Sequence, residues 1–234
     1  MQKIILGLLT LTCVSLSYGQ KNINLALKGE LDSICILDQK YRELFSADIQ
    51  KKSDILKTKG DSIAAAYNVS PEDLLNNLIK AMNQTDSSNM LRVDQILKQY
   101  GYPGKSLVGT PTNEAAFYVI QHSPYIDKYL GVIKKAATKN QLSFILYAMM
   151  LDRSLMYKGK EQIYGTQGKG FECKNPQTGQ TEFKMIVWPV KNPQTVNVRR
   201  KKAGFKDTVE VSAKSMGIEY KVYSLEDFKG MQAK

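Results

Sequence analysis

Apolar residues recur at helical spacing through most of the chain before Gly159, and this spacing ends there. The pattern predicts helices over about residues 25–56, 70–82, 86–100, 112–121, 123–138 and 141–158. Short β-prone segments follow between residues 162 and 190, two of them separated by the turn-like KNPQTGQ. Two short closing helices are expected near residues 197–204 and 207–217. This order predicts an α+β fold that is predominantly α-helical, with five or six packed helices, a small antiparallel β-hairpin near residues 162–190 and short C-terminal helices.

The first 19 residues have the layout of a secretory signal peptide, with one basic residue, an apolar run and a small residue, Gly19, at the expected cleavage position. The apolar run is shorter than a membrane-spanning helix requires. A lipoprotein alternative would use Cys13, but bulky Thr12 precedes it where a small residue is required. We therefore expect a signal peptide over residues 1–19 and one exported domain over residues 20–234, periplasmic or secreted, with no integral membrane span.

The chain is basic, with a formal net charge of +11, and its lysines are spread along the whole sequence. Such a distribution is typical of a solvated basic surface, and no nucleic-acid partner is expected for an exported protein. A small molecule or an envelope component is the expected partner. Two cysteines remain after export, Cys35 and Cys173. They either form a disulfide bond or remain as buried thiols, and the sequence leaves both alternatives open.

Several familiar chemistries are excluded. His122 is the single histidine, which rules out zinc motifs with two histidines, and no cysteine pair has metal-binding spacing. The glycine-rich stretch EQIYGTQGKG (161–170) fails as a phosphate-binding loop because Gly165 and Gly168 are too close together and Gly170 replaces the hydroxyl residue. We expect no cofactor and no metal, although a site built only from carboxylates stays open.

Charged residues occur on helix faces that are otherwise apolar. Asp38 and Arg42 fall on the apolar face of LDSICILDQKYRELF (31–45), and the adjacent Asp152 and Arg153 are surrounded by apolar residues at helical spacing. Burying an unpaired charge costs several kcal/mol, so these four residues are expected to meet one another. His122 and its neighbour Gln121 end the apolar segment AAFYVIQH and could join them. The result would be a polar centre that acts either as a structural network or as a site.

The sequence also resembles an uncharacterised bacterial domain-of-unknown-function family over about residues 25–222. The resemblance is carried, in order, by DQKYR (38–42), GYPGKSLVG (101–109), VIQHSP (119–124), LDR (151–153), GKEQIYGTQ (159–167) and WPVKNPQTVNVRRKKAGF (188–205). No established activity comes with it. The motif positions that it implies are Asp38, Gln39, Arg42, Gln121, His122, Asp152, Arg153, Tyr164, Gly165, Thr166, Gln167, Arg199 and Arg200.

Two classes of function remain open. In a hydrolase-like enzyme, His122 would be the general base for an anionic or carbonyl-containing small substrate, with Asp38 or Asp152 orienting it. Arg42 and Arg153 would then bind the anionic substrate or a developing oxyanion. The resemblance adds Gln39, Gln121, Tyr164 and Gln167 to the binding set, with YGTQ expected to lay a hairpin turn against the polar centre.

The second class is a non-catalytic envelope-binding or structural module. The polar centre would then be a structural network without a cleft beside His122, and basic NVRRKK (197–202) would be a candidate contact patch.

Overall fold

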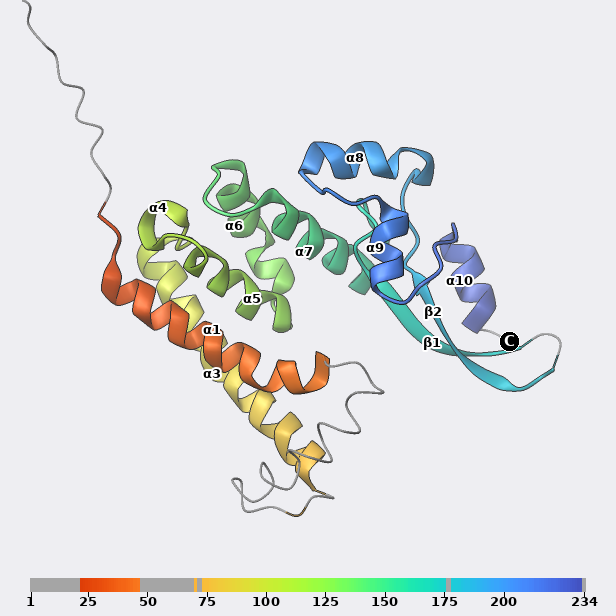
Figure 1. Ribbon diagram of the computed structural model, residues 1–234, viewed down its shortest axis with the longest axis horizontal. Coiled ribbons are helices and arrows are strands. Elements are labelled where there is room, and N and C mark those ends of the chain that lie inside the picture. Colours follow the sequence, from red (N-terminus) through yellow and green to blue (C-terminus); the bar gives the residue numbers. More distant parts are fainter. Residues whose placement is uncertain (1–21, 47–69, 71–72, 176–177, 233–234) are drawn as a thin grey trace, which may run out of the picture.

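The computed structural model describes residues 22–46, 70, 73–175 and 178–232. The expected signal peptide and the end of the first expected helix lie outside these residues. The α+β, mostly helical fold is confirmed (Figure 1). The elements are α1 (Leu25–Ser46), α3 (Leu74–Tyr100), α4 (Lys105–Val108), the 3-10 helix η1 (Thr112–Glu114), α5 (Ala115–His122), α6 (Ile126–Thr138), α7 (Phe144–Tyr157), β1 (Gly168–Lys174), β2 (Thr181–Val187), the 3-10 helix η2 (Pro193–Thr195), α8 (Val196–Ala203), α9 (Val209–Ser215) and α10 (Leu225–Gln232).

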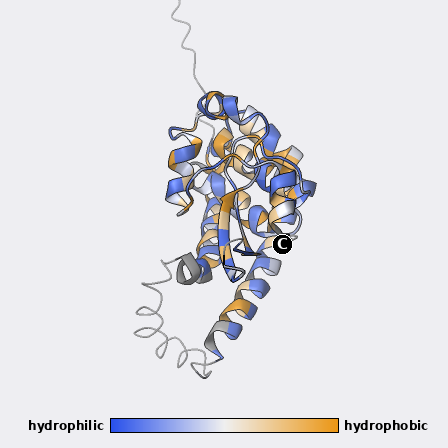
Figure 2. Cartoon of the chain, turned by 90° about the vertical axis from the view of Figure 1, so that its right-hand side faces the viewer, coloured by the Kyte–Doolittle hydropathy of each residue, from blue (hydrophilic) through white to orange (hydrophobic). Residues whose placement is uncertain are grey.

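Helices α1, α3 and α5 pack against one another at the centre of the helical part of the molecule (Figure 1). The apolar stripe of α1 is buried at Leu27, Leu31 and Ile34, which repeat at the spacing of one helix face. On α5, Phe117 and Ile120 are fully buried. Figure 2 shows hydrophilic and hydrophobic residues alternating along the helices, as expected for elements that bury one face. This packing brings the middle of α1 against the C-terminal end of α5.

Helix α3 is continuous from Leu74 to Tyr100, so the expected break near residue 86 is wrong. Asp86 and the two serines after it resemble helix caps, but here they lie inside the helix. Asp86 pairs with Arg42 of α1, and the Asn89 side chain donates a hydrogen bond to the carbonyl of Ile34 on α1. Tertiary contacts with α1 therefore use side chains that could otherwise have capped a helix.

The expected hairpin is confirmed, although its strands begin after YGTQ rather than within it. β1 and β2 pair antiparallel from Gly168 opposite Val187 to Lys174 opposite Thr181. One face of the hairpin is buried against Trp188 and against Phe228 of α10, a helix that the sequence did not predict. The two cysteines among the described residues are free: Cys35 is half-buried in the helical part and Cys173 is buried in the hairpin. The structure therefore supports the alternative of free thiols, although only Cys173 of the two is buried as expected.

Candidate functional site

His122 and Asp38 form a contact pair where α1 meets the end of α5. The Nδ1 atom of His122 lies 3.1 Å from Oδ2 and 3.2 Å from Oδ1 of Asp38. The Asp38 side chain is fully buried, whereas the His122 side chain is 18% exposed. Asp38 lies on the buried face of α1 because it continues the helical spacing of the apolar residues Leu31 and Ile34. The sequence expectation that these two residues meet is thus matched by the geometry.

Two further side chains hold the Asp38 carboxylate in place. Gln39 donates its side-chain amide to Oδ2 at 2.6 Å, and Arg42 donates Nη1 to Oδ1 at 3.2 Å and to the Asp38 carbonyl at 2.5 Å. The other end of the Arg42 guanidinium donates to Oδ2 of Asp86 on α3 at 2.7 Å. Arg42 therefore bridges two carboxylates, and its charge is already used within the protein.

These contacts favour one tautomer of a neutral imidazole. An ionised carboxylate only accepts hydrogen bonds, so the His122 nitrogen that faces Asp38 must carry the proton in the neutral ring. Nε2 then holds the free lone pair and acts as a proton acceptor. Histidines that act as general bases in hydrolytic sites commonly have one ring nitrogen hydrogen-bonded to a buried carboxylate, as Nδ1 of His122 is here.

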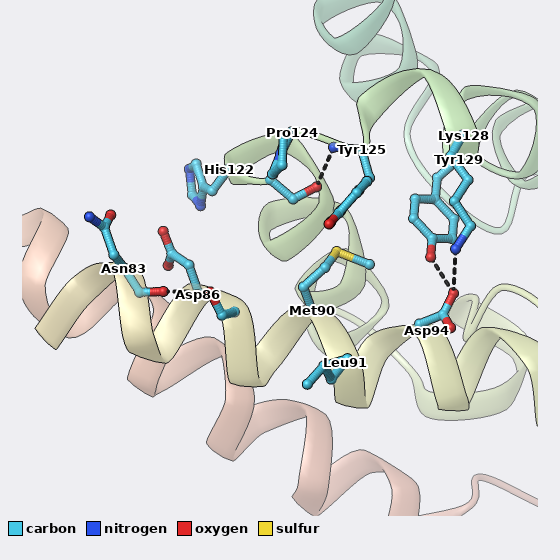
Figure 3. Close-up of a pocket in the computed structure, with 12 residues that line it drawn as sticks. Asn83, Asp86, Met90, Leu91, Asp94, His122, Pro124, Tyr125, Lys128 and Tyr129 are labelled. Atoms are coloured by element: carbon cyan, nitrogen blue, oxygen red, sulfur yellow. Dashed lines mark hydrogen bonds and ion pairs between the residues drawn. The ribbon is translucent and has the colours of Figure 1, made fainter. Parts of the chain in front are cut away.

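A cavity of about 640 Å³ lies between α3 and the turn that joins α5 to α6, and His122 lies on its wall (Figure 3). This volume is within the range of small-molecule sites. In Figure 3 the Asp86 carboxylate points from α3 toward the His122 ring, and Asp94 lies farther along the same helix. The lining residues are Asn83, Asp86, Ser87, Met90, Leu91, Asp94, His122, Ser123, Pro124, Tyr125, Lys128 and Tyr129.

Most of this lining was missed by sequence reasoning. Asn83, Ser87 and Tyr125 are exposed polar or amphipathic residues, and nothing in helical spacing distinguishes them from an ordinary surface. Asp86 was interpreted as a helix cap. Its Oδ1 atom is buried without a hydrogen-bond partner among the described residues, a signal that only the three-dimensional structure provides.

Arg153 and Gln167 form a second polar group behind His122. Arg153 donates Nε to the Gln167 side-chain oxygen at 3.1 Å and Nη1 to the Gln121 carbonyl at 3.3 Å. Gln121, the residue before His122, thus contributes its backbone to this group. Neither Arg153 nor Gln167 lines the cavity. Arg153 and Gln167 therefore support the end of α5 and do not lie where they could contact a substrate in the cavity.

Asp152 lies in a different environment from the one expected. Its carboxylate accepts hydrogen bonds from the backbone N–H groups of Ile163, Tyr164 and Thr166 at 2.7–3.1 Å and from the Thr166 hydroxyl at 3.0 Å. The expected pairing of Asp152 with Arg42 or Arg153 is therefore wrong. Burial raises the pKa of Asp152, and these donors oppose that shift. Asp152 holds the loop onto α7 and makes no contact with His122 among the described interactions.

The glycine-rich loop thus binds an anion after all, but the anion is the protein's own carboxylate. Gly165 permits this wrapping because its φ is +68° and an added Cβ would lie 2.6 Å from a Val209 side-chain atom. The expected hairpin turn at YGTQ is wrong: the loop precedes β1. The Tyr164 ring stacks on Phe205 with a centroid distance of 6.1 Å, so it contributes packing away from the polar group at His122.

The opposite side of the same loop is held by α8. Arg199 donates Nε to the Ile163 carbonyl at 2.9 Å, and Arg200 donates Nη1 to the Tyr164 carbonyl at 2.8 Å. The buried Asp152 and the buried Arg200 therefore face one another through peptide groups rather than directly. Both arginines are committed to carbonyl groups, so of the four basic residues of NVRRKK only Lys201 and Lys202 are exposed as a candidate contact patch.

The fold and the site together define an α+β domain in which a histidine at the wall of a cavity is paired with a buried aspartate. Residues 56–222 match the Family of unknown function (DUF6624), and the chain belongs to this family. The match includes His122, Asp152 and YGTQ but begins after α1, so Asp38, Gln39 and Arg42 lie outside it. No curated protein and no solved structure matches the chain.

The described residues offer neither a clustered metal site nor a membrane-spanning helix. In that part of the chain, no group of three or more His, Cys, Asp or Glu side chains is arranged to hold a metal ion. Among the helices that the structure describes, none combines the length and the apolar character needed to cross a membrane.

Proposed function

We propose that this protein is a hydrolase for a small carbonyl-containing substrate, with His122 as the general base. The observation that carries the proposal is the position of the imidazole: His122 Nδ1 is bound to the buried Asp38, and the same ring lies on the wall of a cavity of about 640 Å³. Asp38 acts as a positioning residue, since its four acceptor contacts leave it no role at the substrate.

Water is the nucleophile that this site supports best. The hydroxyl groups of Ser87 and Ser123, which line the cavity, donate to the backbone carbonyls of Asn83 and Ile120. In the proposed step, Nε2 takes a proton from water while the water oxygen attacks the carbonyl carbon. The bond to the leaving group then breaks, and the imidazolium returns the proton to the departing oxygen or nitrogen.

The alternative is a non-catalytic module in which the same residues are only a structural network. The buried Asp38 and the bridging Arg42 are compatible with both functions. A purely structural network needs no open space beside the imidazole, however, and the cavity at His122 favours the enzyme. We also propose that the protein acts after export, on the basis of its N-terminal sequence.

The test is hydrolysis of chromogenic p-nitrophenyl esters and p-nitroanilides by the chain that begins at Gln20. His122→Gln should lower kcat/KM by about 10²- to 10⁴-fold, the usual contribution of a general base. Glu219→Gln, at a side chain that is 80% exposed and outside the cavity lining, is the control and should retain full activity. Unchanged turnover in His122→Gln, or no turnover of any compound by a folded wild-type protein, would favour the structural network.

A further inference from the structure

The charged groups around the cavity form two clusters with three carboxylates and three cations in total: Arg42 lies between Asp38 and Asp86, and Asp94 lies between Lys98 and Lys128. Asp86 lies 2.7 Å from Arg42, and Asp94 lies 2.6 Å from Lys98 and 3.0 Å from Lys128. Each charged side chain of the lining therefore has its opposite charge within the protein, although the whole chain has a net charge of +11. A charged ligand would lose hydration here and would have to share a partner that already has an opposite charge within the protein.

The polar and apolar parts of the lining are separated along α3. Within the part of the chain that the structure describes, the Asn83 side-chain amide has no hydrogen-bond partner, and Figure 3 places it at the same end of the cavity as His122. Met90 and Leu91 follow along the helix, with Tyr125 opposite Met90 across the cavity. At 1.5 Å per residue, Asn83 and Leu91 are separated by about 12 Å along the helix axis.

We propose that this cavity binds an uncharged carboxylic ester or amide with an aliphatic chain. Its carbonyl group lies at Asn83 and His122, and its chain lies along α3 over Met90 and Tyr125. The Asn83 amide donates a hydrogen bond to the carbonyl oxygen, where negative charge develops when water attacks, and Asn83 is thereby a catalytic residue. The catalytic role of Asn83 rests on the proposed hydrolase function, whereas the binding of the ester or amide does not.

Binding is tested with three probes that share one eight-carbon chain: octanamide, octanoate and octylamine. Isothermal titration of the chain that begins at Gln20 should give an affinity for octanamide at least tenfold higher than for either charged probe. Equal or tighter binding of octanoate or octylamine would overturn the inference, as would a failure of all three probes to bind.

A pair of neighbouring serines gives a matched control. Ser87 and Ser88 are both exposed on α3, but only Ser87 lines the cavity. Ser87→Trp should fill the cavity and reduce octanamide affinity at least tenfold, whereas Ser88→Trp should bind as the wild type does. Asn83→Leu, which keeps the side-chain size but removes the amide, should also weaken octanamide binding. Octanamide binding that survives in both Ser87→Trp and Asn83→Leu would place the ligand elsewhere and contradict the inference.

The two proposals fail in different ways. If octanamide binds to the wild type and to His122→Gln but no ester or amide is hydrolysed, the binding inference stands and the hydrolase proposal fails. If Ser87→Trp hydrolyses esters with full activity while His122→Gln does not, His122 remains the general base and the assigned cavity is wrong.

Discussion

Replacing Asp152 with alanine should destabilise the fold strongly. The substitution removes the acceptor of three backbone N–H groups, those of Ile163, Tyr164 and Thr166, in a partly buried loop. Each unsatisfied donor costs roughly 1–3 kcal/mol, and relief of the buried charge and entry of water offset part of the sum. We therefore expect a loss of about 3–5 kcal/mol, a large share of the roughly 5–15 kcal/mol that stabilises a typical domain.

Urea unfolding followed by far-ultraviolet circular dichroism measures this loss. Asp127→Ala is the matched control, since Asp127 also contacts α7, through the Ser154 hydroxyl, but has a side chain that is 56% exposed and pairs with Lys158. Its removal should cost no more than about 1 kcal/mol. If the two variants unfold at similar urea concentrations, or if Asp152→Ala stays within about 1 kcal/mol of the wild type, the reasoning about the carboxylate and its loop is refuted.

Three further predictions concern pH, the cysteines and export. Burial raises the folded-state pKa of Asp152 above 3.8. The wild type should therefore gain stability relative to Asp152→Asn as pH falls through that raised pKa. A stability advantage of the wild type that grows with rising pH would contradict this. Cys35 and Cys173 should both react with a thiol reagent in unfolded, unreduced protein, whereas two unreactive thiols would indicate a disulfide. Intact mass of exported protein should show cleavage after Gly19 and a new terminus at Gln20, and a lipid-modified Cys13 would overturn the expected export route.

Much of the fold was accessible from the sequence because periodicity is a local property. The buried stripe of α1, the helices from α5 to α7 and the change of texture at Gly159 all follow from the spacing of apolar residues. The continuity of α3 could not be predicted, because Asp86 is a residue type that commonly caps helices. Only the three-dimensional structure shows that its carboxylate pairs with Arg42 instead. Helix α10 is short, and its packing on the hairpin depends on contacts distant in sequence.

The candidate site was predicted in part for a similar reason. Helical spacing showed that Asp38, Arg42 and His122 point into apolar surroundings, and the shared need for partners brought them together correctly. The same argument failed for Asp152, because buried charges can be satisfied by backbone amides as well as by side chains. The cavity residues, Asn83 among them, carry no such signal: a polar residue that contacts a ligand has the same local pattern as one that contacts water.

The tautomer of the His122 imidazole tests the central claim most directly. Because the chain has a single histidine, its signals are unambiguous in protein without a histidine tag. Nitrogen-15 NMR of neutral His122 should show a protonated Nδ1 and an unprotonated Nε2. Octanamide should shift the Nε2 signal, and Asp38→Asn should change the tautomer balance. A protonated Nε2 in the neutral wild-type ring would contradict the account, because His122 would then present a donor to the cavity instead of a base.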